Sequence, residues 1–301
     1  MKKKFIPLFF LCIILIIGCK AHNVDNNSFY SPGETKKELF IMTSFYPVYI
    51  TTLNITKDVP GVKVINLTPP VTGCLHNYSL TSNNMKDLAL ADIFVINGAG
   101  MESFLDKVIK ENSDLKIVEA SKDIELIRGT HEEYNPHVWT SVSNLIKQVE
   151  NIQKDLSKYD PAHSELYKEN ALYYIERLYK LKTDIKEGLK DIKNRNIITF
   201  HEAFPYFAKE FDLNIVAVIQ REPGTEPNAR ELTETINLIK GKKVKALFIE
   251  PQYPKNSADV ISRETGLKLY NLDPVVTGPI ELDAYIKIMN RNLLVLQEAL
   301  R

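Results

Sequence analysis

Residues 160–192 read DPAHSELYKENALYYIERLYKLKTDIKEGLKDI. Apolar residues recur there every three or four positions, at Ala171, Ile175, Leu178, Leu181, Ile185, Leu189 and Ile192. This spacing predicts one buried face of an α-helix, with Asp160 and Pro161 at its start. A helix from Ala162 to Ile192 would span ~45 Å at ~1.5 Å per residue. The alternative is a break at Gly188, since glycine costs ~1 kcal/mol in a helix interior.

Short apolar runs alternate with helical patterns on both sides of this helix. Strands are expected at 39–42, 62–67, 92–96 and 115–118, then at 197–200, 215–218, 246–249 and 268–272. Helices are expected at 84–90, 101–111, 229–240, 257–265 and 282–300. Such alternation is typical of βαβ units around a parallel sheet. The sequence therefore predicts an α/β fold of two Rossmann-like lobes, residues 38–159 and 194–301, joined by one long rigid helix at 160–193.

The N-terminus predicts export and lipidation. Three lysines precede the uncharged apolar run from Phe5 to Gly18, which is shorter than the ~20 residues of a transmembrane helix. We therefore expect residues 1–18 to be a signal peptide, and Cys19 to be the lipidated first residue of the mature chain. A plain signal peptide is the alternative. Residues 19–37 are polar and predict a flexible tether, which would leave the protein anchored outside the cytoplasm on a bacterial membrane.

Charge and cysteine content narrow the classes of partner. The chain has 38 basic and 38 acidic residues, so no basic excess predicts nucleic-acid binding. Loss of residues 1–18 removes three lysines and no acid, and the resulting slight negative charge favours a cation. The mature chain keeps Cys74 besides the acylated Cys19, so no disulfide framework is expected.

Three histidines lie in loops or at strand ends. His76 lies in the loop after the strand at 62–67, His137 follows Pro136 in a restrained turn, and His201 directly follows the strand at 197–200. Ligands of open α/β sheets bind beyond the carboxyl ends of strands. Neutral imidazole is the commonest protein ligand of zinc-class metals, so these three residues are the predicted core of a metal site.

A closed tetrahedral site needs a fourth ligand. Asp273 is the best candidate, because it follows the strand at 268–272, and Glu250 is the reserve. Glu202 is a weaker candidate. Contributions from His131 and from Cys74, as a soft ligand, remain open.

Catalytic motifs are missing from the sequence. The segments that begin at His201 and His131 start like a zincin helix, but neither has the second histidine four residues on. There is no G-x-S-x-G, P-loop or G-x-G-x-x-G sequence. We therefore expect a binding protein and not an enzyme.

Several segments, in the right order, resemble the solute-binding proteins of zinc and manganese ABC importers (the ZnuA/TroA type, cluster A-I). The matching segments are Asp92–Gly98 followed by Met101-Glu102, Asn135–Trp139, Phe200–Phe207, Glu250–Tyr253 and Leu272–Pro274. Two segments differ from the family: Gly73-Cys74-Leu75-His76 replaces the usual P-G-x-D/E-P-H, and the long His-rich loop is missing.

The resemblance implies two lobes with a metal held between them. His76 and His137 would come from the first lobe, and His201 and Asp273 from the second. A histidine at the third position accompanies zinc in this family, so Zn(2+) is expected and Mn(2+) is possible.

The expected function is capture of a divalent transition metal and its delivery to an ABC permease, by a monomer. The alternatives are a metal-dependent hydrolase and a surface adhesin or lipoprotein that the metal only stabilises.

Overall fold

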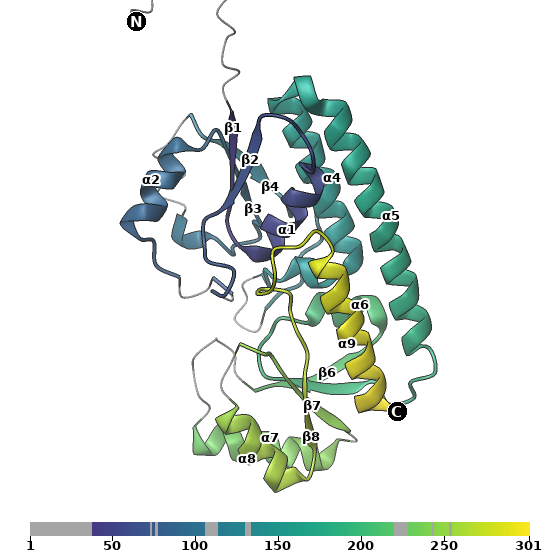
Figure 1. Ribbon diagram of the computed structural model, residues 1–301. Helices are drawn as coiled ribbons and strands as arrows, with labels where there is room; N and C mark the ends of the chain where they lie inside the picture. Colours follow the sequence, from purple (N-terminus) through teal and green to yellow (C-terminus); the bar gives the residue numbers. More distant parts are fainter. Residues whose placement is uncertain are drawn as a thin grey trace, which may run out of the picture. The chain divides into compact units, whose positions relative to one another are not determined.

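A four-stranded parallel sheet forms the first half of the described chain (Figure 1). The computed structural model describes residues 38–72, 74–75, 78–105, 114–129, 134–219, 228–242, 244–252 and 255–301. The strands are β1 (Leu39–Thr43), β2 (Val62–Asn66), β3 (Ile93–Ile96) and β4 (Lys116–Glu119), in the order β2-β1-β3-β4. Ile41 and Met42 are successive residues of β1 and are both fully buried. Both faces of the sheet are therefore covered, which explains why its strands are continuous apolar runs.

The helices of this half are α1 (Tyr46–Ile55), α2 (Ser82–Leu90) and α4 (Val142–Tyr159), with 3-10 turns η1 (Ser103–Leu105) and η2 (Val138–Thr140). Side chains set where α2 and α4 begin. The Thr81 hydroxyl accepts from Asn84 N, and Asn84 Oδ1 accepts from Thr81 N, which is a capping box. The Ser141 hydroxyl likewise accepts from Asn144 N at the start of α4.

The second half repeats the parallel sheet. Its strands are β5 (Asn196–Thr199), β6 (Asn214–Val218), β7 (Ala246–Ile249) and β8 (Lys268–Asn271), in the order β6-β5-β7-β8. Its helices are α6 (Pro205–Phe211), α7 (Ala229–Gly241), α8 (Asn256–Thr265) and α9 (Ala284–Leu300). Ile198 and Leu247 belong to the core cluster under α7 and α8, whereas Ile197 and Phe248 belong to the main core with α6 and α9. The sheet is thus covered on both faces (Figure 1).

The long helix α5 (Ser164–Leu189) follows the 3-10 turn η3 (Pro161–His163) and lies beside both halves (Figure 1). It contacts α1 and α4 of the first half and α6 and α9 of the second. The predicted α/β fold of two parallel-sheet lobes joined by one long helix is confirmed. Gly188 does not break α5: a Cβ there would lie 2.8 Å from Leu293 Cδ1, so glycine lets α9 approach the α5 backbone closely.

One hydrophobic cluster runs through both halves, from Ile41 to Leu300. Residues Glu38–Arg301 accordingly form a single compact unit. The two sheets therefore share a core, and relative motion of the halves would disturb buried packing. None of the helices in the described ranges is long and apolar enough to span a bilayer.

Some predicted elements differ from the observed ones. The long helix is shorter at both ends than the predicted 162–192, because Pro161 begins a separate 3-10 turn and the helix ends at Leu189. Where a helix was predicted at 101–111, the structure has the 3-10 turn η1, and residues 106–113 lie outside the described part. The helices α1, α4 and α6 were not predicted from the sequence. Residues 1–37, with the predicted signal peptide, Cys19 and tether, are also outside the described part.

Candidate metal centre

Two of the predicted ligands, His137 and His201, come together at the junction of the halves. His137 directly precedes η2 in the first half, and His201 lies two residues after β5 in the second. Their ring centroids are 4.7 Å apart, with the ring planes 82° to one another. Both side chains are almost fully buried. Two imidazoles from distant parts of the chain therefore share one water-poor position.

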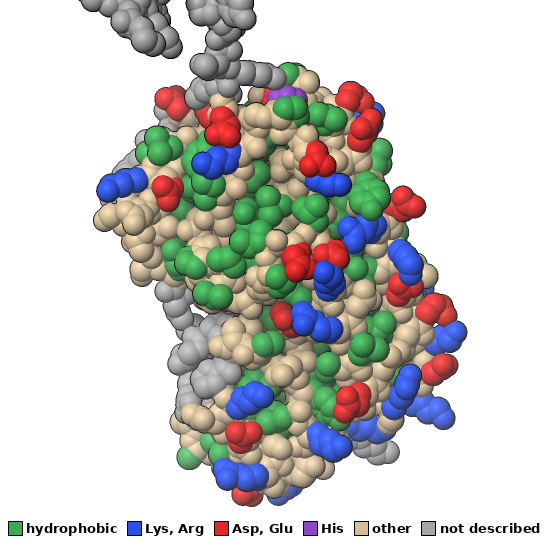
Figure 2. Space-filling model, in the orientation of Figure 1, with side chains coloured by type: hydrophobic (Ala, Val, Ile, Leu, Met, Phe, Trp, Pro, Cys, Tyr) green, Lys and Arg blue, Asp and Glu red, His purple; other side chains and the backbone are tan. Residues whose placement is uncertain are grey.

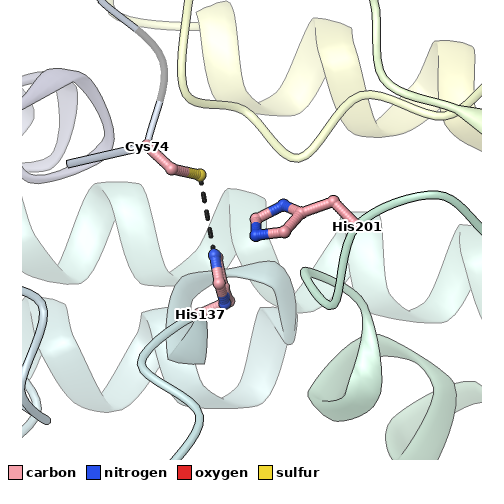
Figure 3. A group of neighbouring side chains, drawn as sticks. All are labelled: Cys74, His137 and His201. Carbon is pink, nitrogen blue, oxygen red and sulfur yellow. Dashed lines mark hydrogen bonds between the residues drawn. The ribbon is translucent and has the colours of Figure 1, made fainter. Parts of the chain in front are cut away.

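Cys74 completes a group of three donors. Its Sγ lies 3.5 Å from His137 Nε2, and one donor atom from each of Cys74, His137 and His201 lies within 4.8 Å of the other two. Figure 3 shows the three side chains converging from different segments. Among the described residues this is the one His, Cys, Asp or Glu group with that spacing. Nitrogen and sulfur donors suit zinc-class cations.

A neighbouring side chain orients each imidazole. His137 Nδ1 lies 3.1 Å from Asn135 Oδ1, which also accepts from the backbone N–H of His137. Because the amide oxygen can only accept, Nδ1 carries the proton and Nε2 of His137 is left as an acceptor toward Cys74. Metal-binding histidines almost always have such a partner on the second nitrogen.

Glu250 plays the same part for His201. Its Oε1 lies 3.0 Å from His201 Nδ1, and its Oε2 accepts from Gln252 Nε2 at 2.7 Å. Glu250 is buried at the end of β7, next to His201 at the end of β5. The residue predicted as a reserve ligand thus lies against the back of a histidine ring, where it fixes the tautomer.

Asp273 lies at the same junction but outside the three-donor group. Its Oδ1 accepts from Val275 N at 2.8 Å, and the next residue, Pro274, accepts from Trp139 Nε1 at 2.7 Å. Trp139 belongs to η2, so the Asp273 segment lies against the turn that carries His137. Burial raises the pKa of the Asp273 carboxyl to about 6, which the hydrogen bond from Val275 partly opposes.

The other predicted positions have varied placements. His76 and His131 lie outside the described residues. The backbone carbonyl of Glu202 accepts from Asn135 Nδ2 at 2.7 Å, so this residue is tied to the His137 turn by its main chain. The role of Cys74 was open from the sequence, and the orienting roles of Asn135 and Glu250 were not predicted. The segments that resemble the family contained both of these orienting residues.

Hydrogen bonds join the two halves around Cys74, His137 and His201. Tyr206 Oη donates to Asn135 O at 2.7 Å, Thr140 Oγ1 donates to Ala203 O at 3.2 Å, and Tyr285 Oη donates to Trp139 O at 2.9 Å. All three are buried. Breaking a buried hydrogen bond of this kind costs free energy because the polar group loses its partner. The metal-binding side chains therefore lie at a junction that resists opening.

A second hydrogen-bond network holds the turn that carries His137. Asn97 Nδ2 donates to Pro136 O at 3.0 Å, and Asn97 Oδ1 accepts from Gln148 Nε2 of α4 at 2.9 Å. The buried Glu102 carboxylate accepts from Asn97 N and Gly98 N. Burial raises the pKa of Glu102 to about 7, although these hydrogen bonds lower it. The position of His137 therefore depends on side chains that follow β3.

Two parallel sheets joined by one long helix are the architecture of a class of solute-binding proteins. The structure of the solute-binding protein FpvC from Pseudomonas aeruginosa in complex with Mn2+ superposes with a TM-score of 0.80 at 31% identity, over 88% of this chain and 98% of that one. The family model of ZnuA, the periplasmic component A of the zinc-uptake complex, matches residues 41–299. The chain belongs to the ZnuA family.

Two relatives show how far the likeness extends. The high-affinity zinc uptake system protein ZnuA of Bacillus subtilis (strain 168) is 31% identical, over 100% of this chain and 99% of its own. The zinc-binding lipoprotein AdcA of Streptococcus pneumoniae (strain ATCC BAA-255 / R6) is 30% identical over 99% of this chain. This chain spans 61% of the length of AdcA.

Proposed function

We propose that this protein captures a divalent transition metal outside the cytoplasm, zinc in the first place, and delivers it to an ABC importer. The observation that carries the proposal is the convergence of two buried, oriented imidazoles, His137 and His201, at the junction of the halves. The names of the relatives, a zinc uptake protein and a zinc-binding lipoprotein, support zinc as the cargo.

The ligands proposed from the sequence are His76, His137 and His201, with Asp273 as the fourth donor. Three imidazoles and one carboxylate suit zinc, whereas manganese prefers more oxygen, so Mn(2+) is the secondary cargo. Burial raises the pKa of Asp273 because it disfavours the ionised carboxylate. A nearby cation would offset this cost and so stabilise the ionised form.

The proposed mechanism is capture and release without chemistry. Four protein ligands leave no open position for a reacting water, which argues against the hydrolase alternative. The hydrogen bonds between the halves, such as Tyr285 to Trp139, support only a small closure when the metal binds. Release would then need a partner that disturbs the junction, and the permease is the proposed partner.

The proposed location is the outer face of the bacterial membrane. Residues 1–18 would be removed as a signal peptide, and lipid on Cys19 would anchor residues 19–37 as a tether. Mass spectrometry of the mature protein tests this: a diacylated N-terminal Cys19 supports it, and an unmodified residue at that position contradicts it.

Metal analysis of the purified protein tests capture. One zinc per chain is expected for the wild type. His201→Ala should lose tight binding and Asp273→Ala should weaken it less. His163→Ala is the matched control, because His163 pairs with Asp160 beside α5, and it should keep the full metal content. Equal zinc in the wild type and His201→Ala would contradict the site.

Growth under zinc limitation tests delivery. Deletion of the gene should slow growth in the presence of a zinc chelator, and added zinc should restore it. Unchanged growth and unchanged cellular zinc would favour the alternative of an adhesin or lipoprotein that the metal only stabilises.

A further inference from the structure

We infer that the thiolate of Cys74 is a metal ligand beside the imidazoles of His137 and His201, and that it makes the site prefer thiophilic cations. The inference rests on the proposed metal capture and changes its ligand set: Cys74 binds the cation in place of Asp273. It follows from the geometry of the three-donor group, in which Cys74 is included and Asp273 is not.

The distance between the donors matches that on a shared ion. Zinc binds sulfur at ~2.3 Å and imidazole nitrogen at ~2.0–2.1 Å, so on a tetrahedral ion these two donors are ~3.5 Å apart. The observed separation of Cys74 Sγ and His137 Nε2 is 3.5 Å. The sulfur and the nitrogen therefore already have the separation that one bound cation requires.

Contacts that do not involve Cys74 point the same way. Asn135 occupies Nδ1 of His137 and Glu250 occupies Nδ1 of His201. Each contact leaves Nε2 as the nitrogen for a cation, and Nε2 of His137 is the atom that faces Cys74. The orientation of the imidazoles is thus fixed by buried groups on the far side of both rings, as it is in metal sites.

Asp273 is less well placed for this position. Its Oδ1 already accepts from Val275 N, and its backbone is held by Asn292 through the N–H and the carbonyl of Asp273. Its carboxyl still adds negative charge near the site, because the carbonyl of the adjoining Pro274 accepts a hydrogen bond from Trp139 Nε1, next to the His137 turn. A long-range charge of this kind would help any cation and would not select among them.

A sulfur ligand changes which cations the site prefers. A thiolate is a soft donor that favours zinc and cadmium, whereas manganese prefers carboxylate, carbonyl and water. Binding forms a sulfur–metal bond and releases the thiol proton to solvent. The site would therefore discriminate against manganese more strongly than three imidazoles and a carboxylate do.

X-ray absorption of the zinc-loaded full chain tests the bond in the native protein. One sulfur scatterer at ~2.3 Å is expected besides the nitrogens. It should persist in Cys19→Ser, the control that keeps Cys74, and disappear in Cys74→Ser. A zinc shell made of nitrogen and oxygen alone in the wild type would overturn the inference and leave the proposed function intact. Absence of bound zinc would overturn both.

Competition with a chelator tests the selectivity. Loss of an outer partner of a ligand costs about 10–100-fold in affinity, so Cys74→Ser should weaken zinc by more than about tenfold. The effect on manganese should be smaller, and Asp273→Asn should affect zinc less than Cys74→Ser does. Equal zinc affinity in the wild type and Cys74→Ser, or a greater loss in Asp273→Asn, would overturn the assignment.

Discussion

Nδ1 of His201 lies 3.0 Å from Oε1 of Glu250, and both side chains are almost completely buried. A carboxylate in this position holds the imidazole in one tautomer and increases the basicity of the nitrogen on the other side of the ring. It also adds a negative charge next to the proposed cation in a region that water does not screen.

Glu250→Gln should therefore weaken zinc binding by about 10–100-fold while the fold is retained. The glutamine oxygen can still accept a hydrogen bond from His201 Nδ1 and so keep the orientation of the ring. The loss of zinc affinity therefore measures mainly the effect of the Glu250 charge. Chelator competition gives the affinity. Glu264→Gln in α8 is a matched control, because Glu264 is exposed and should leave the affinity unchanged. Equal affinities in the wild type and Glu250→Gln would show that the carboxylate charge has no role.

Asn135→Asp should lower the free energy of unfolding and raise the affinity for zinc. Asn135 Nδ2 donates to Glu202 O across the junction, and an aspartate would place a second acceptor against that carbonyl. We expect a loss of about 1–3 kcal/mol in the free energy of unfolding of the metal-free protein. Zinc affinity should rise, because the introduced carboxylate would bring a negative charge to Nδ1 of His137. Urea unfolding and chelator competition check the two effects, and a variant that is no less stable would contradict the assigned role of the Asn135 amide.

Glu102 should make stability depend on pH. Its ordinary pKa of 4.5 is raised to about 7 by burial, so protonation stabilises the folded state. This contribution is fully present below pH 4.5 and is lost as the pH rises through about 7. At ~1.4 kcal/mol per pKa unit its full size is about 3 kcal/mol.

The measurement is urea unfolding at several pH values for the wild type and Glu102→Gln. As the pH increases from about 5 to about 8, the wild type should lose unfolding free energy relative to Glu102→Gln, because only the wild type can ionise at this position. A difference that stays constant over this range would show that Glu102 does not titrate there.

Glu210→Ala should destabilise the junction without removing a ligand. The Glu210 carboxylate of α6 accepts from the hydroxyls of Ser141 and Ser143 and from Ser143 N at the start of α4, and Lys182 Nζ lies 3.4 Å from it. Removal takes the acceptor away from Ser141, Ser143 and Lys182 in a part-buried position, so we expect a loss of about 1–3 kcal/mol in unfolding free energy.

Glu187→Ala is the control for this prediction. Glu187, near the end of α5, pairs with the exposed Lys190, and its removal should leave the unfolding free energy nearly unchanged, because exposed ion pairs contribute little. Zinc stoichiometry should stay at one in both variants. A Glu210→Ala protein as stable as Glu187→Ala would contradict the role of this network.

The strands of both sheets could be predicted because parallel strands covered on both faces are written as continuous apolar runs, such as Ile93–Ile96 and Ala246–Ile249. The long helix could be predicted from its spacing. The helix α4 carries a similar 3–4 spacing of buried residues, from Val142 to Leu156, and could have been found in the same way. The helix α1 could not, because most of its residues are buried and polar residues do not mark an outer face.

The sequence by itself therefore determined the two α/β halves, the helix between them and the histidines that follow strands or turns, since these depend on local pattern. Only the tertiary structure decided which side chains meet. His137 and His201 are far apart in the chain, and only the shared core of the two halves brings their rings to 4.7 Å. The placement of Cys74 among the donors and of Glu250 behind His201 depends on the same packing, because distances between segments far apart in the chain are set by how whole sheets and helices pack.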